Sequence, residues 1–183
     1  MMLGFPRSGT TLLENALAAH RRIETFEEIA SLETAIAYLD KGYRKAGADQ
    51  GKRYEIAAQA RDRYFAEIDR RAKKPGVTVS IDKMPIRSLY SPLMAKLLPE
   101  QRYIFSIRHP YDVALSCFKQ RFKPNGAMSS FLSFADTVQL YDFAMTTWFK
   151  DHSLDDPLVH YVRYNQLVTN FEEKVRKTLT FLG

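Results

Sequence analysis

A glycine-rich segment near the start of the chain has the residue types and spacing of a phosphate-binding loop. Residues 4–9 give the Gly-x-x-x-x-Gly spacing, and two threonines follow it directly. In loops of this kind, backbone N–H groups and the N-terminus of the next helix attract anions. The residues that we expect to hold a phosphate group are Arg7, Ser8, Gly9, Thr10 and Thr11.

The loop departs from the nucleotide-hydrolysing type at one position. A Walker A loop places a lysine after its second glycine, where it reaches the β- and γ-phosphates. Here Thr10 takes that place, and the positive charge comes from Arg7 inside the loop. A kinase or NTPase also needs an acidic residue for magnesium. The sequence therefore predicts anion binding without a metal ion.

A second group of phosphate-binding residue types follows the apolar run 103–107. Arg108 comes at the end of this run, and Ser116 lies eight residues further on. An arginine grips phosphate through two parallel hydrogen bonds, and a serine one or two helical turns later adds a hydroxyl on the same side. Charged residues also follow the β-branched run 77–81, where Asp82 and Lys83 stand.

The elements that must position these residues alternate between strand and helix. Short β-branched or apolar runs predict strands at 77–81, 103–107 and 158–162, and residues 1–3 form the stub of a strand before the loop. Apolar residues at helical spacing predict helices that follow Gly9 and that cover the ranges 32–39, 52–74, 89–97, 110–118, 134–148 and 170–182. Residues 27–28 fall in a connection between helices, and 123–126 in a loop. This alternation predicts a three-layer α/β fold of the P-loop type, with a central parallel sheet flanked by helices.

Length and composition restrict the class of protein further. The 183 residues fit one domain, predicted to span 1–183, and contain no apolar run near the roughly 18 residues of a membrane span. A net charge of +6 suits a polyanionic ligand. Because no nucleic-acid-binding motif and no zinc-ligand spacing is present, a small phosphorylated ligand is favoured over nucleic acid. The single cysteine, Cys117, and the lack of a secretion signal favour the cytoplasm.

Three motifs in order resemble those of the sulfotransferases. Pro-Arg-Ser-Gly-Thr-Thr before a leucine-rich helix is similar to their 5′-phosphosulfate loop, above all in tyrosylprotein and TPR-linked bacterial enzymes. The segment 108–116 and the segment 162–168, with the closing Phe-Leu-Gly, resemble the second and third motifs. The resemblance implies a sulfuryl donor, 3′-phosphoadenosine 5′-phosphosulfate (PAPS), no metal, and a hydroxyl- or amine-bearing acceptor.

The resemblance also implies roles for single residues in donor binding. Arg108 and Ser116 match the pair that holds the 3′-phosphate, and Tyr164 matches the residue near the adenine. Asn165 stands where the family has an acid, which leaves the local hydrogen bonding at that point open. Lys83 matches the family lysine, and we expect it to act with Arg7 on the sulfuryl group and the leaving oxygen.

The base is the least determined part of the predicted site. Glu28 lies seventeen residues after Thr11, where tyrosylprotein sulfotransferases carry a catalytic glutamate in a Glu-Glu pair, here Glu27 and Glu28. Because an acceptor hydroxyl must lose its proton to react, Glu28 is the predicted general base. Other sulfotransferase groups use histidine, so His109 and His20 remain alternatives.

Two further questions stay open in the sequence. Only three residues precede Gly4, and family members continue beyond Phe-Leu-Gly, so we expect the domain to be incomplete at both ends. A nucleotide-binding module without catalysis and an atypical P-loop nucleotide kinase are the alternatives to a sulfotransferase. Neither the acceptor nor the oligomeric state can be deduced from these residues.

Overall fold

The computed structural model describes residues 1–120 and 128–183, and in them a five-stranded parallel sheet forms the centre of the molecule. The strand order is β2-β3-β1-β4-β5. The strands are β1 (Met2–Gly4), β2 (Ile23–Glu27), β3 (Val79–Lys83), β4 (Tyr103–Ile107) and β5 (Val159–Arg163). Because all neighbouring pairs run parallel, the carboxyl ends of the five strands meet at one edge of the sheet.

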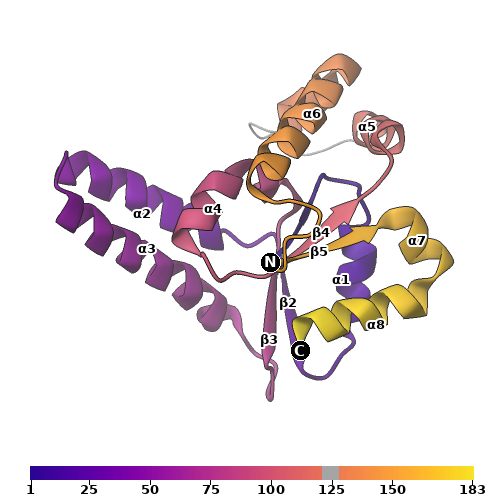
Figure 1. The fold of residues 1–183 in the computed structure, drawn as a ribbon, viewed down its shortest axis with the longest axis horizontal. Helices are drawn as coiled ribbons and strands as arrows, with labels where there is room; N and C mark the ends of the chain where they lie inside the picture. The colour runs from indigo at the N-terminus through magenta and orange to yellow at the C-terminus, as the bar shows by residue number, and fades with distance from the viewer. Residues whose placement is uncertain (121–127) are drawn as a thin grey trace.

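Helices cover both faces of this sheet (Figure 1). They are α1 (Thr10–Ala18), α2 (Ser31–Ala46), α3 (Gln50–Arg71), α4 (Ser91–Leu97), α5 (Pro110–Lys119), α6 (Phe134–Asp151), α7 (Tyr164–Thr169) and α8 (Phe171–Leu182), with short 3₁₀ turns η1 (Pro85–Tyr90) and η2 (Met128–Leu132). In Figure 1, α1 and α8 lie together on one side, and α2 and α3 form a hairpin that extends away from the sheet on the other. The predicted three-layer α/β fold is confirmed.

Separate hydrophobic clusters lie on the two faces of the sheet, and a further one packs α5 against α6. In β4, Tyr103 and Phe105 face the cluster built with α2, α3, α4 and α6, whereas Ile104 faces the cluster built with α1 and α8. Side chains alternate between the faces of a strand, so a strand with helices on both sides is apolar throughout. This explains why 103–107 carries large apolar side chains on successive positions, with Ser106 as its one polar residue.

The strand β2 was not predicted. Residues 27–28 were predicted to lie in a connection between helices, but residues 23–27 pair with β3 along its whole length, from Ile23 opposite Val79 to Glu27 opposite Lys83. Its two large apolar residues face opposite sides: Ile23 packs with the α1 cluster and Phe26 with the α2 cluster. The pairing brings residues 27–28 to the carboxyl edge of the sheet.

Other boundaries differ by a few residues. The predicted strand 77–81 is β3 at Val79–Lys83, and the predicted helix 89–97 begins as the 3₁₀ turn η1. The predicted loop 123–126 lies outside the described residues. Within the described part of the chain, none of the helices combines the length and the apolar character needed to span a bilayer.

Candidate functional site

The glycine-rich loop connects β1 to α1 and holds an unusual backbone conformation. Gly9 has φ 94°, and Arg7, which is not a glycine, has φ 70°. Left-handed backbone at a non-glycine residue costs roughly 1 to 3 kcal/mol and persists where the surrounding structure imposes it. Gly9 caps α1 without a side-chain hydrogen bond to the helix. The first N–H groups of α1 therefore face the loop and are free to bind an anion.

Buried donors without hydrogen bonds line the same loop. Ser8 is 2% exposed, yet its Oγ has no hydrogen-bond partner, and the Nε of Arg108 is also without a hydrogen bond, with the Asp112 carboxylate 3.7 Å away as an ion pair. An unpaired buried polar group costs about 1 to 3 kcal/mol, so such groups indicate a missing partner. A hydroxyl and a guanidinium beside a helix N-terminus suit a phosphate oxygen.

Four of the residues predicted to bind a nucleotide meet at this edge. Arg7 Nε donates to Ser116 Oγ at 3.1 Å, and Arg108 Nη1 donates to the carbonyl oxygen of Arg7 at 3.2 Å. The Arg108 guanidinium lies 4.5 Å from the centre of the Tyr164 ring. The loop after β1, the start of α5 and the start of α7 are thus joined through side chains.

The ring of Tyr164 also rests on the loop itself. A Cβ atom placed on Gly9 would lie 2.4 Å from Cδ2 of this ring. Only a glycine allows such a close approach. Next to this contact, an open hollow of about 350 Å³ runs along α5, and its lining residues are Arg108, Asp112, Leu115, Ser116, Lys119 and Gln120.

A second cluster of charge lies at the carboxyl ends of β2 and β3. The side chain of Lys83 is 1% exposed, and its Nζ lies 2.7 Å from Glu27 Oε1, 3.3 Å from Glu14 Oε2 and 3.8 Å from Glu28 Oε1. Glu28 has φ 50°, and its N–H donates to the carbonyl oxygen of Lys83 at 2.8 Å. The structure thus brings the predicted base and the predicted lysine together. Sequence reasoning missed Glu14.

The helical spacing of α1 indicates that Glu14 is buried. The buried residues of this helix are Thr10, Leu13, Glu14 and Leu17. A stripe at positions i, i+3, i+4 and i+7 faces the core, so a glutamate in this phase must be buried. A buried carboxylate requires a partner, and here the partner is Lys83.

The charges in this cluster shift one another's protonation. Burial by itself lowers the pKa of Lys83, but the hydrogen bond with Glu27 and the charge of Glu14 raise it above its ordinary value. Burial, together with the charge of Glu27, raises the pKa of Glu14 above its ordinary value in spite of the opposing effect of the Lys83 ammonium group. The lysine is therefore held as a cation at neutral pH.

The two alternative histidines occupy different places. His109 caps α5 at the carboxyl edge of the sheet, is exposed, and stacks on Tyr111 with ring centres 5.7 Å apart. His20 lies between the end of α1 and the start of β2, where its Nδ1 accepts from the N–H of Arg22 at 3.3 Å. Since β2 begins at the amino edge, His20 lies at the edge of the sheet opposite to the loop.

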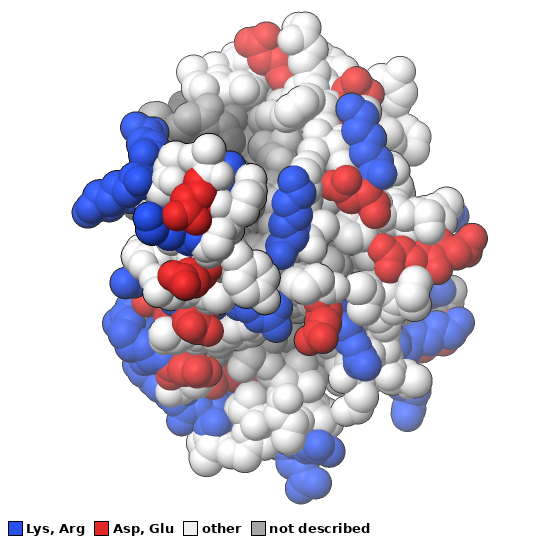
Figure 2. Space-filling view, turned by 60° about the vertical axis from the view of Figure 1, so that its left-hand side comes forward, with Lys and Arg blue, Asp and Glu red and all other residues white. Residues whose placement is uncertain are grey.

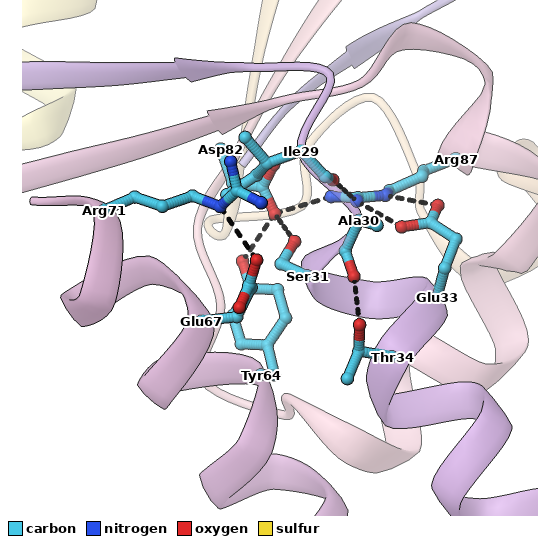
Figure 3. A network of polar contacts seen from close by, with 10 residues as sticks. All are labelled: Ile29, Ala30, Ser31, Glu33, Thr34, Tyr64, Glu67, Arg71, Asp82 and Arg87. Atoms are coloured by element: carbon cyan, nitrogen blue, oxygen red, sulfur yellow. Dashed lines mark hydrogen bonds and ion pairs between the residues drawn. The ribbon is translucent and has the colours of Figure 1, made fainter.

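A third polar network is buried under α2 and α3 (Figure 3). Arg87, 0% exposed, donates from Nη1 to Asp82 Oδ2 at 2.5 Å and from Nη2 to Glu33 Oε2 at 2.6 Å. Asp82 also accepts from Ser31 Oγ at 2.6 Å and from the Tyr64 hydroxyl at 3.1 Å. These contacts link α2, α3, β3 and η1, so this network supports the architecture.

On the face of the molecule that carries the outer end of the α2–α3 hairpin, charged side chains of one sign do not form a patch. Figure 2 shows acidic and basic side chains interspersed over this face. Among residues 1–120 and 128–183, no three histidine, cysteine, aspartate or glutamate side chains are grouped as metal ligands would be.

Comparison with known proteins decides the family. A profile described as "Sulfotransferase family" matches residues 1–183. The chain belongs to the sulfotransferase family. An uncharacterized protein of Aquifex aeolicus (strain VF5) is 25% identical over an aligned region of 190 residues that covers 98% of this chain and 25% of that protein. The chain thus spans about a quarter of the length of this relative.

Solved structures of sulfotransferases share the fold. The sulfotransferase domain from the curacin biosynthetic pathway superposes with a TM-score of 0.65 at 18% identity, over 99% of this chain and 72% of the other. A sulfotransferase of Mycobacterium avium gives a TM-score of 0.61 at 13% identity, over 98% and 62%. One from Alicyclobacillus acidocaldarius gives 0.61 at 15% identity, over 100% and 79%.

Proposed function

We propose that this sulfotransferase uses PAPS as its donor and transfers the sulfuryl group to a hydroxyl- or amine-bearing acceptor. The observation that supports this most directly is the meeting of Arg7, Ser116, Arg108 and Tyr164 beside a glycine loop whose buried Ser8 hydroxyl has no hydrogen-bond partner. Two phosphorylated ends and one aromatic base require this combination of two cationic groups and a ring. Residues 1–183 are proposed as one domain with a single site.

The loop and the start of α5 divide the donor between them in this proposal. The 5′-phosphosulfate binds to the loop, and the residues that hold it are Arg7, Ser8, Gly9, Thr10 and Thr11. Arg108 and Ser116 hold the 3′-phosphate, and Tyr164 packs against the adenine. Ser116 is already hydrogen-bonded to Arg7, so the two phosphate subsites lie next to each other.

The transfer is an in-line displacement in which positioning and electrostatics do most of the work. Glu28 takes the proton of the acceptor, whose oxygen or nitrogen then forms the new bond to sulfur. The bond between sulfur and the bridging oxygen breaks, and this oxygen leaves with the electron pair on the 5′-phosphate. Arg7 and Lys83 stabilise the charge that develops on the leaving oxygen.

Donor binding is tested by calorimetry with adenosine 3′,5′-bisphosphate (PAP) in the presence of EDTA. We expect binding by the unmodified chain, and affinity weaker by about 10- to 100-fold in Arg108→Ala, since a charge-assisted contact contributes about 1.5 to 3 kcal/mol. Arg176→Ala is the matched control, because this exposed arginine pairs only with Glu172 among its recorded contacts. Binding of ATP that depends on magnesium, with no heat from PAP, would instead favour the kinase alternative.

Catalysis is tested by transfer of radiolabelled sulfate from PAPS to a panel of hydroxyl and amine acceptors. We expect Glu28→Ala to abolish turnover and to leave PAP binding nearly unchanged. Glu55→Gln, on the exposed surface of α3, serves as the control. Full turnover by Glu28→Ala together with its loss in His109→Ala would move the base to the histidine. PAP binding without transfer to any acceptor would favour the non-catalytic module.

A further inference from the structure

We infer that Glu14 is a positioning residue for Lys83: it holds the ammonium group at the carboxyl edge of the sheet and keeps it charged while the other carboxylates exchange partners. The inference rests on the proposed function, because Lys83 is the cation assigned there to the leaving oxygen. It adds a residue that the sequence motifs do not include.

The three carboxylates around Lys83 differ in their exposure. The side chains of Glu27 and Glu28 are 62% and 60% exposed, whereas that of Glu14 is 5% exposed. An exposed glutamate reorients at little cost, but a buried one is held by its packing. Glu27 and Glu28 are therefore free to release the amine, and Glu14 is the partner that stays.

Glu14 also links the lysine to the phosphate-binding loop. It lies one helical turn after Thr10, on the same buried stripe of α1, and α1 begins directly at the loop. Lys83 belongs to β3, which is paired with β2 on one side and with β1 on the other. The contact of 3.3 Å between Glu14 and Lys83 thus sets the distance between the lysine and the loop that precedes α1.

The charge of Lys83 depends on this contact during a reaction cycle. A buried ammonium group without a countercharge loses its proton, because desolvation disfavours the cation. If the hydrogen bond to Glu27 is given up in favour of a sulfuryl oxygen, Glu14 is the buried carboxylate that remains next to the amine. Among the described residues, the carboxylates of Glu27, in β2, and of Glu28, which follows it, are the other charged groups within 4 Å of the Lys83 amine.

The protonation of Lys83 can be followed without any ligand. We would titrate the ¹³Cε-labelled lysines by NMR in the ligand-free chain and assign the Lys83 signal by its absence in Lys83→Met. In Glu14→Gln we expect the pKa of Lys83 to fall by about one to three pH units, the effect of one opposite charge at this distance. An unchanged titration of Lys83 in Glu14→Gln overturns the inference.

Three further variants separate an effect on the position of Lys83 from a general loss of stability. Glu33→Gln removes a carboxylate from the buried Arg87 and should lower the unfolding temperature without moving the Lys83 titration. Glu14→Met keeps the length of the side chain and suits the apolar stripe of α1, so it replaces Glu14→Gln if that variant does not fold. Glu14→Asp keeps the negative charge, so the pKa of Lys83 in this variant should lie close to its value in the unmodified chain. A Lys83 titration that moves equally in Glu33→Gln would contradict the inference.

The activity measurement then tests the same residue in the reaction. In Glu14→Gln we expect kcat to fall about tenfold and the alkaline limb of its pH profile to begin at lower pH, with the affinity for PAP within twofold of the unmodified chain. If the unmodified chain neither binds PAP nor transfers sulfate, the proposed function fails, and the NMR titration still decides whether Glu14 controls Lys83.

Discussion

Asp82 and Lys83 are neighbours in β3, yet they belong to two charge clusters of opposite character. Side chains alternate along a strand, so Asp82 points toward α2 and α3 and Lys83 toward α1. Asp82 meets Arg87, and the side chains of both are at most 2% exposed. Lys83 is equally buried, but two of its three partners are more than half exposed.

The exposure of their partners separates a buried charge that stabilises the fold from one that is available to a ligand. Around Asp82 every partner is fixed on a helix or a 3₁₀ turn, and the contacts tie α2, α3 and η1 to the sheet (Figure 3). Around Lys83 the exposed carboxylates allow a ligand to replace them. We therefore expect loss of stability from changes on the Asp82 side and loss of activity from changes on the Lys83 side.

The largest effect is expected from Arg87→Met. Removing one member of a buried ion pair leaves the other charges unpaired and costs about 3 to 5 kcal/mol of the free energy of unfolding. Urea denaturation measures this loss. Arg70→Met is the control, because Arg70 pairs with Glu67 with its own side chain 65% exposed, and such a pair contributes about 1 kcal/mol or less. Equal losses in the two variants would break the contrast between the clusters.

Lys83→Met should act on the reaction rather than on the fold. We expect sulfate transfer from PAPS to fall by about 10² to 10³, the usual cost of losing one group that stabilises developing charge. Its unfolding free energy should fall less than that of Arg87→Met. Lys74→Met is the matched control: Lys74 Nζ donates to the carbonyl oxygens of Ala18, His20 and Ile23, so its loss should lower stability and spare turnover. The opposite pattern in the two lysine variants would make Lys83 structural.

Tyr64→Phe tests the Asp82 cluster with a smaller change. The hydroxyl of Tyr64 donates to Asp82 at 3.1 Å within the buried network. Loss of a hydrogen bond to a charged group lowers the free energy of unfolding by about 1.5 to 3 kcal/mol. Urea denaturation should show this loss, and kcat with any accepted substrate should stay the same. A fall in kcat at unchanged stability would connect the network to catalysis.

The smallest effect concerns alkaline pH. The folded-state pKa of Lys83 is raised above its ordinary 10.5, so its contribution to stability is complete below pH 10.5 and is lost as pH rises through the higher folded value. We expect the difference in unfolding free energy between the unmodified chain and Lys83→Met to be constant from pH 8 to 10 and to shrink above that. For Arg87→Met the difference should persist over the same range, since a guanidinium stays protonated. A difference that shrinks already below pH 9 would contradict the raised pKa.

Local signals made most of the fold predictable, and a missing local signal explains β2. An apolar run interrupted only by Ser106 marked β4, and helical spacing marked the helices, because a strand buried on both faces and a helix buried on one face differ in their apolar pattern. In β2, Ile23 and Phe26 lie three residues apart and face opposite sides, at the edge of the sheet. A strand with one large apolar residue per face shows no alternation.

Some residues of the candidate site could be predicted from local sequence signals, and others could not. The glycine loop, Arg108 and Tyr164 follow strands in the sequence, and parallel pairing brings such positions to one edge. The helical spacing of α1 predicts that Glu14 is buried, but a charged residue in an apolar stripe is easily assigned to the surface. The contacts of Arg87 with Asp82 and Glu33 come from three elements, and no spacing along the chain specifies them.

Because Tyr164 lies so close to Gly9, the absence of a side chain at position 9 affects three segments: the glycine loop, Arg108 before α5, and the start of α7. A methyl group at position 9 would displace the ring, and the ring would then withdraw from the guanidinium above it, which in turn bonds to the backbone of Arg7. A side chain at position 9 therefore meets two obstacles: the left-handed backbone of Gly9, at φ 94°, and the aromatic ring of Tyr164, 155 positions later.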